Sequence, residues 1–278
     1  MSFINDFNNE LKTITSDVPG EVQCIDAIIK ALKNGNYPNV MAKKLHQRRC
    51  TFSAKGINTT REICDIFLIL RYKDYYRFTF IQNKSRIKHS YNGLDQFTID
   101  AGQHYLLVNT PPFTYNNVTY NVLTNSVFDT VTSYSVFYKN SNGDIDFDFS
   151  SAKSCVCSGC NSFSCCNFSK KQHCTASHKH KVNTHIFKKK FYDFISSENI
   201  HRIENNLHFG EVVKADDAKF KELSALIFNV GGARIADFLG IDSISAEYMS
   251  PQANGDEVKN SEIPAVKFRS IVAIDMRG

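Results

Sequence analysis

The sequence predicts an α/β fold in which a mixed β-sheet is flanked by helices. Three observations support this class. Apolar residues recur at helical spacing near the N-terminus, and again at residues 215–228. Two segments between residues 62 and 84 are rich enough in Ile, Leu, Phe and Tyr to form buried strands. Residues 266–274 read as a last strand.

The elements before the buried strands are two helices and a segment of undecided structure. The first helix is expected at residues 3–15, and Asp17-Val18-Pro19-Gly20 ends it. The second is expected at residues 21–33 and ends at Asn34-Gly35-Asn36. Residues 40–55 are basic and fit either a helix or a strand.

The elements after the buried strands are less regular. Residues 94–108 are expected to run as helix or extended chain into a short strand, Tyr105–Val108, which Pro111-Pro112 stops. Residues 118–139 alternate polar and apolar side chains, as further strands would.

The two buried strands, Glu62–Leu70 and Tyr76–Lys84, form a predicted hairpin. If the turn is centred between Lys73 and Asp74, Asp65 falls opposite Gln82. Residues two apart share a strand face, so Lys84 points the same way as Gln82. An acid, an amide oxygen and an amine would then converge at one end of the hairpin, where they can hold a divalent cation and activate a water.

This arrangement of Asp65, an apolar strand and Gln82-Asn83-Lys84 resembles the PD-(D/E)xK nuclease superfamily, with Gln in the variable position. The resemblance covers about residues 1–112 and implies a restriction-endonuclease-like core. It also implies Mg²⁺ held by the Asp65 carboxylate, the Gln82 side-chain oxygen and the Asn83 backbone carbonyl. Lys84 would orient the water or stabilise developing charge. An ordinary amphipathic hairpin is the alternative.

The resemblance implies one more acid from an N-terminal helix, for which Glu10 is preferred over Glu21. Glu62 is three residues from Asp65, so an unbulged strand would place it on the opposite face, as a surface acid. Gln103 and Tyr105 are similar to a Gln/Tyr element that contacts DNA or the lysine in some relatives; a plain loop-to-strand junction is the alternative. His104 is expected to be a satisfied polar residue.

A segment rich in cysteine and histidine follows, and from Phe149 to Tyr192 it holds no acidic residue. Six of the nine cysteines lie between Cys155 and Cys174, a density typical of a structural Zn²⁺ site. The preferred ligands are Cys157, Cys160, Cys165 and Cys174, with Cys166 as an alternative to Cys165. A reduced, flexible loop is the main alternative, and a redox or iron–sulfur role is a further one.

Charge and composition suggest the partner. The chain carries a net charge of +5, and Lys188, Lys189 and Lys190 belong to a one-signed run that suits phosphate. DNA is therefore the expected partner, with RNA as an alternative and with a homodimer or partner subunit left open. No apolar run approaches a membrane span and no secretory signal is seen, so a cytoplasmic protein with no membrane partner is expected.

The sequence thus predicts a nuclease-like α/β core (1–148), a zinc-binding insertion rich in Cys, His and Lys (149–192) and a C-terminal α/β part packing on the core (193–278). The expected function is that of a Mg²⁺-dependent endonuclease, a hydrolase of DNA phosphodiester bonds; antiviral defence against foreign DNA is a setting implied by the resemblance alone. The alternative is a catalytically silent module with a structural zinc that binds nucleic acid or protein.

Overall fold

The computed structural model describes most of the chain outside its cysteine-rich segment. The described residues are 3–14, 18–35, 37, 39–54, 57–59, 62–85, 87, 96–115, 118–126, 131–157, 173–178, 210–242 and 266–276. Among them, no helix is both long enough and apolar enough to cross a membrane.

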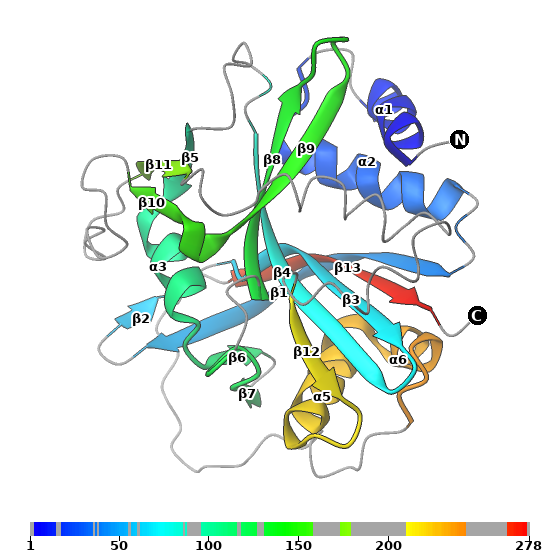
Figure 1. Ribbon diagram of the computed structural model, residues 1–278, viewed down its shortest axis with the longest axis vertical. Coiled ribbons are helices and arrows are strands. Elements are labelled where there is room, and N and C mark those ends of the chain that lie inside the picture. Colours follow the sequence, from blue (N-terminus) through cyan, green and yellow to red (C-terminus); the bar gives the residue numbers. More distant parts are fainter. Residues whose placement is uncertain are drawn as a thin grey trace.

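A mixed sheet of ten strands lies at the centre of the described structure (Figure 1). The strands are β1 (Val40–Ala54), β2 (Ile57–Thr59), β3 (Cys64–Tyr72), β4 (Tyr75–Ser85), β6 (Phe113–Tyr115), β7 (Val118–Tyr120), β8 (Thr132–Lys139), β9 (Ile145–Ser151), β12 (Glu211–Lys214) and β13 (Val266–Asp275). The order is β7-β6-β1-β13-β3-β4-β8-β9, with β2 beside β1 and β12 beside β4. The pairs β13–β3 and β4–β8 are parallel and the others antiparallel, so the predicted mixed sheet is confirmed.

Helices cover both faces of this sheet (Figure 1). Helices α1 (Phe3–Ile14) and α2 (Glu21–Asn34) pack on one face, and α5 (Ala218–Gly231) and α6 (Ala233–Phe238) pack on the other. Successive residues of β3 divide between these cores: Ile66 and Leu68 pack with α1 and α2, whereas Phe67 and Ile69 pack with α5 and α6. A fully buried strand of this kind reads as continuously apolar, which explains the composition that predicted it.

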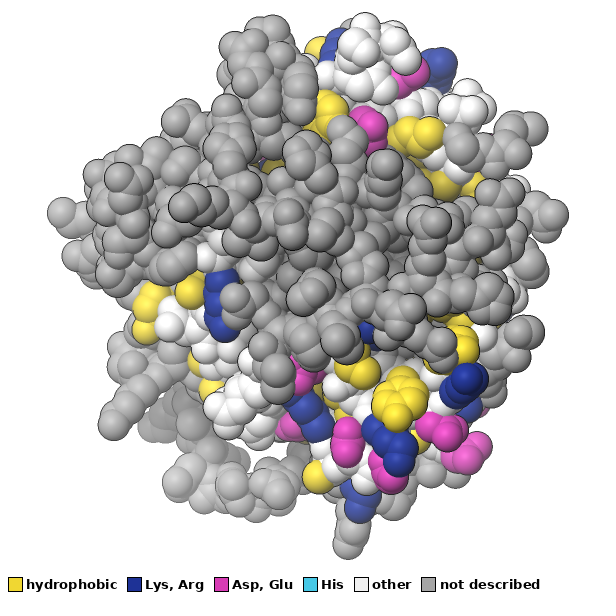
Figure 2. Space-filling model, in the orientation of Figure 1, with side chains coloured by type: hydrophobic (Ala, Val, Ile, Leu, Met, Phe, Trp, Pro, Cys, Tyr) yellow, Lys and Arg dark blue, Asp and Glu magenta, His cyan; other side chains and the backbone are white. Residues whose placement is uncertain are grey.

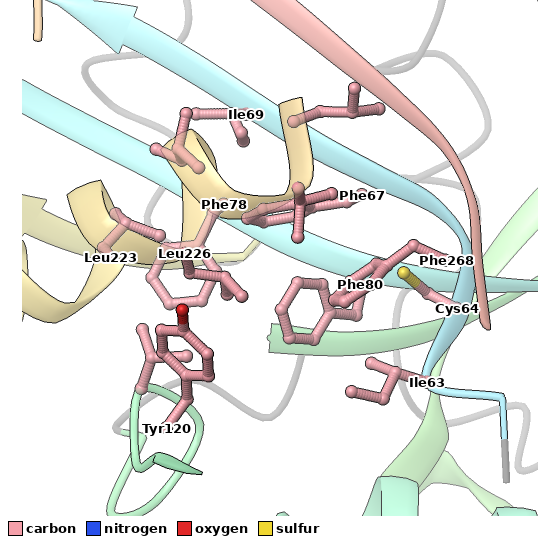
Figure 3. Close-up of a cluster of buried hydrophobic side chains, with 14 of the residues drawn as sticks. Ile63, Cys64, Phe67, Ile69, Phe78, Phe80, Tyr120, Leu223, Leu226 and Phe268 are labelled. Atoms are coloured by element: carbon pink, nitrogen blue, oxygen red, sulfur yellow. The ribbon is translucent and has the colours of Figure 1, made fainter. Parts of the chain in front are cut away.

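The core beneath α5 is strongly aromatic. Phe67 and Phe80 come from neighbouring strands, and their ring centroids are 4.6 Å apart. Figure 3 shows these two rings in one cluster with Phe78, with Leu223 and Leu226 of α5, and with Phe268 of β13. The hairpin is therefore covered by α5 on this face and paired with β13 along the edge of β3.

The structure confirms both predicted N-terminal helices and the predicted last strand, and it decides two uncertain segments. The basic residues 40–55, which fitted either structure, supply β1. The strand predicted at Tyr105–Val108 is wrong, because these residues belong to α3 (Ala101–Asn109). The side chain of Asp100 caps this helix by accepting a hydrogen bond from the backbone N–H of Gln103, and Thr110 ends the helix with a φ of 45°.

A second sheet of three strands lies beside α3. Its order is β10 (Cys155–Cys157), β11 (His173–His178) and β5 (Gln96–Asp100). Phe97 and Ile99 of β5 pack with Leu107 of α3 and with Tyr134 and Val136 of β8. This small core fixes α3 over the end of the hairpin.

Candidate functional site

The hairpin places Asp65 and Gln82 together, as the sequence predicts. Strands β3 and β4 pair from Ile66–Ile81 to Tyr72–Tyr75, which centres the turn between Lys73 and Asp74. The next pair in that register is Asp65 and Gln82, and Gln82 Nε2 donates to Asp65 Oδ2 over 2.6 Å. The predicted register and the predicted contact of these two side chains are confirmed.

Asp65 is a buried carboxylate, 1% exposed, that receives three donors. Besides Gln82, the backbone N–H of Asn83 donates to Oδ2 over 2.7 Å. Arg269 Nε lies 2.9 Å from Oδ1. The side-chain hydroxyl of Ser270 in turn donates to the backbone carbonyl of Asp65 over 2.7 Å. Asp65 is thus anchored through its backbone and both carboxylate oxygens.

Gln103 connects Lys84 to this carboxylate. From the first turn of α3, Gln103 Nε2 donates to Gln82 Oε1 over 2.8 Å and to the backbone carbonyl of Glu62 over 3.1 Å. Lys84 Nζ lies 3.5 Å from Gln103 Oε1. The result is a polar run from Lys84 through Gln103 and Gln82 to Asp65. The resemblance implies that Gln103 contacts the lysine, and Gln103 Oε1 does lie next to Lys84 Nζ, although Gln103 is on a helix and not at a loop-to-strand junction.

Glu62 is a member of this site, and the expectation that it lies on the opposite face is wrong. Arg269 Nε donates to Glu62 Oε1 over 2.6 Å, and Nη2 lies 3.4 Å from Oε2. Strand β3 begins only at Cys64, so strand alternation does not govern the direction of the Glu62 side chain. Its carboxylate and that of Asp65 share one guanidinium.

Arg269 was missed by the sequence reasoning. It lies on β13, between Phe268 and Ser270, which pair with Cys64 and Ile66 of β3 in parallel register. Arg269 is 207 residues from Glu62 along the chain. No short motif joins them, so only the pairing of the last strand with β3 could have revealed the contact.

The electrostatics of the site follow from burial and from shared charge. Burial, and after it the charge of Glu62, raises the pKa of Asp65 to about 7. The charges of Arg269 and Lys84 and the hydrogen bond from the backbone N–H of Asn83 oppose that rise. Burial disfavours the charge of Arg269, but its hydrogen bond to Glu62 and the charges of Glu62, Asp65 and Glu21 together raise its pKa.

The further acid predicted for the site, Glu10, lies elsewhere on the described surface. Glu10 accepts from Asn34 Nδ2 over 2.8 Å and lies 3.5 Å from the hydroxyl of Thr13, both at exposed positions on the helices. Neither contact joins Glu10 to Asp65. Glu21, the other acid considered, acts on Arg269 through its charge.

The two carboxylates of the site already share one cation, because Glu62 and Asp65 both contact the guanidinium of Arg269. Carboxylate oxygens are also ligands that Mg²⁺ prefers. Two details differ from the predicted ligand set: Gln82 turns its amide nitrogen toward Asp65 and its oxygen toward Gln103, and Asn83 meets Asp65 through its N–H. Within the described residues, no three His, Cys, Asp or Glu side chains form a metal-holding group.

The predicted zinc segment is described only in part. Cys157 ends β10 and Cys174 lies in β11, two strands that pair antiparallel. Cys160 and Cys165 lie outside the described residues, as do Lys188, Lys189 and Lys190. Cys155 is a core residue whose thiol lies 3.6 Å from the hydroxyl of Ser150, and burial raises its pKa to about 12.

The described surface carries charges of both signs. In the face shown in Figure 2, Lys and Arg side chains alternate with Asp and Glu over the region of α5 and β12. Lys214 and Asp216 are an example, with Nζ 2.6 Å from Oδ2. This part of the described surface is therefore no uniform basic patch.

Comparison of the chain with protein-family models, with curated proteins and with solved structures found no match.

Proposed function

We propose that this protein is a metal-dependent nuclease with a restriction-endonuclease-like core that hydrolyses phosphodiester bonds of DNA. The observation that carries the proposal is the polar run at one end of the hairpin, in which Asp65, Gln82, Gln103 and Lys84 meet. A buried acid and an amine joined through two glutamines are parts that such hydrolysis uses, because the acid can hold a metal ion and the amine can stabilise developing charge.

The proposed roles follow from the chemistry of each side chain. Asp65 would hold Mg²⁺, which supplies a Lewis acid at the phosphate and acidifies water when bound. Lys84 would stabilise charge that develops on the phosphate oxygens, since an ammonium beside the reacting group favours the transition state. Gln103 would position Lys84, because its Oε1 is the contact that the structure gives Nζ.

The test uses the full chain and supercoiled plasmid DNA with Mg²⁺ or Mn²⁺. Wild-type protein should nick or linearise the plasmid, and Lys84→Ala and Asp65→Asn should each lose about a hundredfold or more in rate. Lys139→Ala, an exposed lysine on β8, is the matched control and should keep its activity. Circular dichroism would establish that the variants are folded. Full activity in folded Lys84→Ala protein would remove the assignment.

A catalytically silent nucleic-acid- or protein-binding module is the second candidate, and the Arg269 contact favours it. The guanidinium already neutralises Asp65 and Glu62, so this site could persist as a structural ion network. A silent module would leave the plasmid intact while still shifting its mobility. Neutralising Lys188, Lys189 and Lys190 should then flatten the dependence of binding on salt by about 0.9 in log–log slope per lost phosphate contact.

A structural zinc in residues 149–192 is proposed from the sequence alone. Protein purified without added zinc should contain about one zinc per chain, held by a subset that includes Cys157, Cys160, Cys165 and Cys174. Cys160→Ser should lower this content, and Asp65→Asn should not, because zinc is held by thiolates and magnesium by oxygen ligands. Protein free of zinc with these thiols freely titratable would refute it. Defence against foreign DNA is proposed on the resemblance alone.

A further inference from the structure

Arg269 stands where a divalent cation would need to bind. Its Nε is shared between Glu62 Oε1 at 2.6 Å and Asp65 Oδ1 at 2.9 Å, so one guanidinium already meets the charge of both acids. The two acids differ in setting, since the Asp65 side chain is 2% exposed and that of Glu62 is 19% exposed. A second cation on Asp65 would face the positive charge of Arg269 at contact distance.

We propose that Arg269 and a divalent cation compete for the Asp65 carboxylate, and that Glu62 keeps the guanidinium once Asp65 is released. The inference rests on the proposed function, because it concerns the metal site of that nuclease. Arg269 is then an internal cation that occupies the site until a metal ion displaces it, and Glu62 is the residue that permits the exchange.

The geometry indicates which part of this network moves. Asp65 is held by Ser270 at its backbone carbonyl and by Asn83 and Gln82 at its carboxylate, so it is fixed. Glu62 precedes β3, and its side chain meets Arg269 at two atom pairs. The side chain of Arg269 is 33% exposed. The Glu62–Arg269 pair can therefore withdraw together, which avoids leaving an isolated buried charge.

A neutral residue of similar length at position 269 should release the site. A charge-assisted hydrogen bond of this kind corresponds to about tenfold or more in an equilibrium constant. Arg269→Gln should therefore bind Mn²⁺ at least about tenfold more tightly than wild type, whereas Arg269→Lys keeps the positive charge and should gain less than Arg269→Gln. Adding Asp65→Asn to Arg269→Gln should abolish the gained site.

The test is a titration of the full chain with Mn²⁺. Binding is monitored by isothermal calorimetry and by the electron paramagnetic resonance signal of free Mn²⁺. Glu62→Gln separates the role of Glu62 from that of a direct ligand. In the wild-type background this change should weaken Mn²⁺ binding, because Arg269 then has only Asp65 to hold. In the Arg269→Gln background it should have no effect, and an equal loss in both backgrounds would overturn the role given to Glu62.

A second measurement covers the case in which Arg269→Gln fails to fold. In wild-type protein labelled with ¹⁵N, saturating Mg²⁺ should shift the Arg269 Nε–H resonance, while Lys139→Gln should leave that shift unchanged. Competition is overturned if Mg²⁺ binds without that shift, or if folded Arg269→Gln binds Mn²⁺ no more tightly than wild type. Tight Mn²⁺ binding without plasmid cleavage would instead overturn the proposed nuclease and leave the competition standing.

Discussion

Replacing Asp65 with asparagine should change how the stability of the protein depends on pH. The pKa of this carboxyl rises from an ordinary value of 3.8 to about 7 in the folded protein, mainly because of burial. A carboxyl whose folded pKa is raised contributes stability below its unfolded pKa and loses that contribution as pH rises through the folded pKa. The rise corresponds to about 4 kcal/mol in total, of which about 3 kcal/mol falls between pH 4.5 and 7.5.

His104 should act in the opposite direction over the same range. Burial is the main cause that lowers its pKa from 6.5 to about 4, so the folded protein gains stability as pH rises through that interval. This gain is about 2 to 3 kcal/mol between pH 4.5 and 7.5, which offsets most of the effect of Asp65 in the wild-type protein. Asp65→Asn removes one of the two contributions and should reveal the other.

The assay is urea unfolding at several pH values between 4.5 and 7.5, followed by far-ultraviolet circular dichroism because the chain has no tryptophan. Relative to wild type, Asp65→Asn should gain about 3 kcal/mol in the free energy of unfolding across this range. Asp144→Asn, at an exposed turn, is the matched control and should follow the wild-type curve.

The difference in slope between the two curves decides the question. A steady gain of Asp65→Asn over wild type as pH rises would mean that burial raises the pKa of Asp65 into this range. Parallel curves would mean that the three donors from Gln82, Asn83 and Arg269 outweigh burial and keep the carboxyl ionised throughout the range. If Asp65→Asn does not fold, the carboxyl carbon resonance of Asp65 in ¹³C-labelled wild type reports the same midpoint directly.

Three further changes test the site and the sheet. Gln82→Glu would replace a hydrogen-bond donor to Asp65 with a second negative charge. Urea unfolding should therefore show a free energy of unfolding lower by about 1–3 kcal/mol without metal, and recovery of that stability with millimolar Mg²⁺. No recovery would argue against a cation between these residues. Gln103→Ala would remove the hydrogen-bond donor to Gln82 Oε1, so the free energy of unfolding should fall by about 1–3 kcal/mol. An unchanged melting temperature would contradict this. Ending the chain before Val266 removes β13 from the middle of the sheet, so the product should show no cooperative unfolding transition, and a normal one would refute the strand order.

The local geometry of the candidate site could be predicted from the sequence because it depends on neighbours along one hairpin. A short turn at Lys73 and Asp74 determines which residues are opposite, and strand alternation then determines which side chains share a face. Asp65 and Gln82 therefore meet as expected. The helices at both ends were equally readable, since their apolar stripes are local patterns.

The rest of the site was decided by contacts between distant parts of the chain. Arg269 reaches Glu62 across 207 residues because β13 enters the sheet between β1 and β3, and no spacing rule encodes that pairing. Gln103 reaches Lys84 because the segment capped by Asp100 is a helix held by a small core, where the sequence left helix or extended chain open and predicted a strand at Tyr105–Val108. Spacing along the chain predicts faces within one element, whereas tertiary packing determines which charges from different elements share one buried carboxylate.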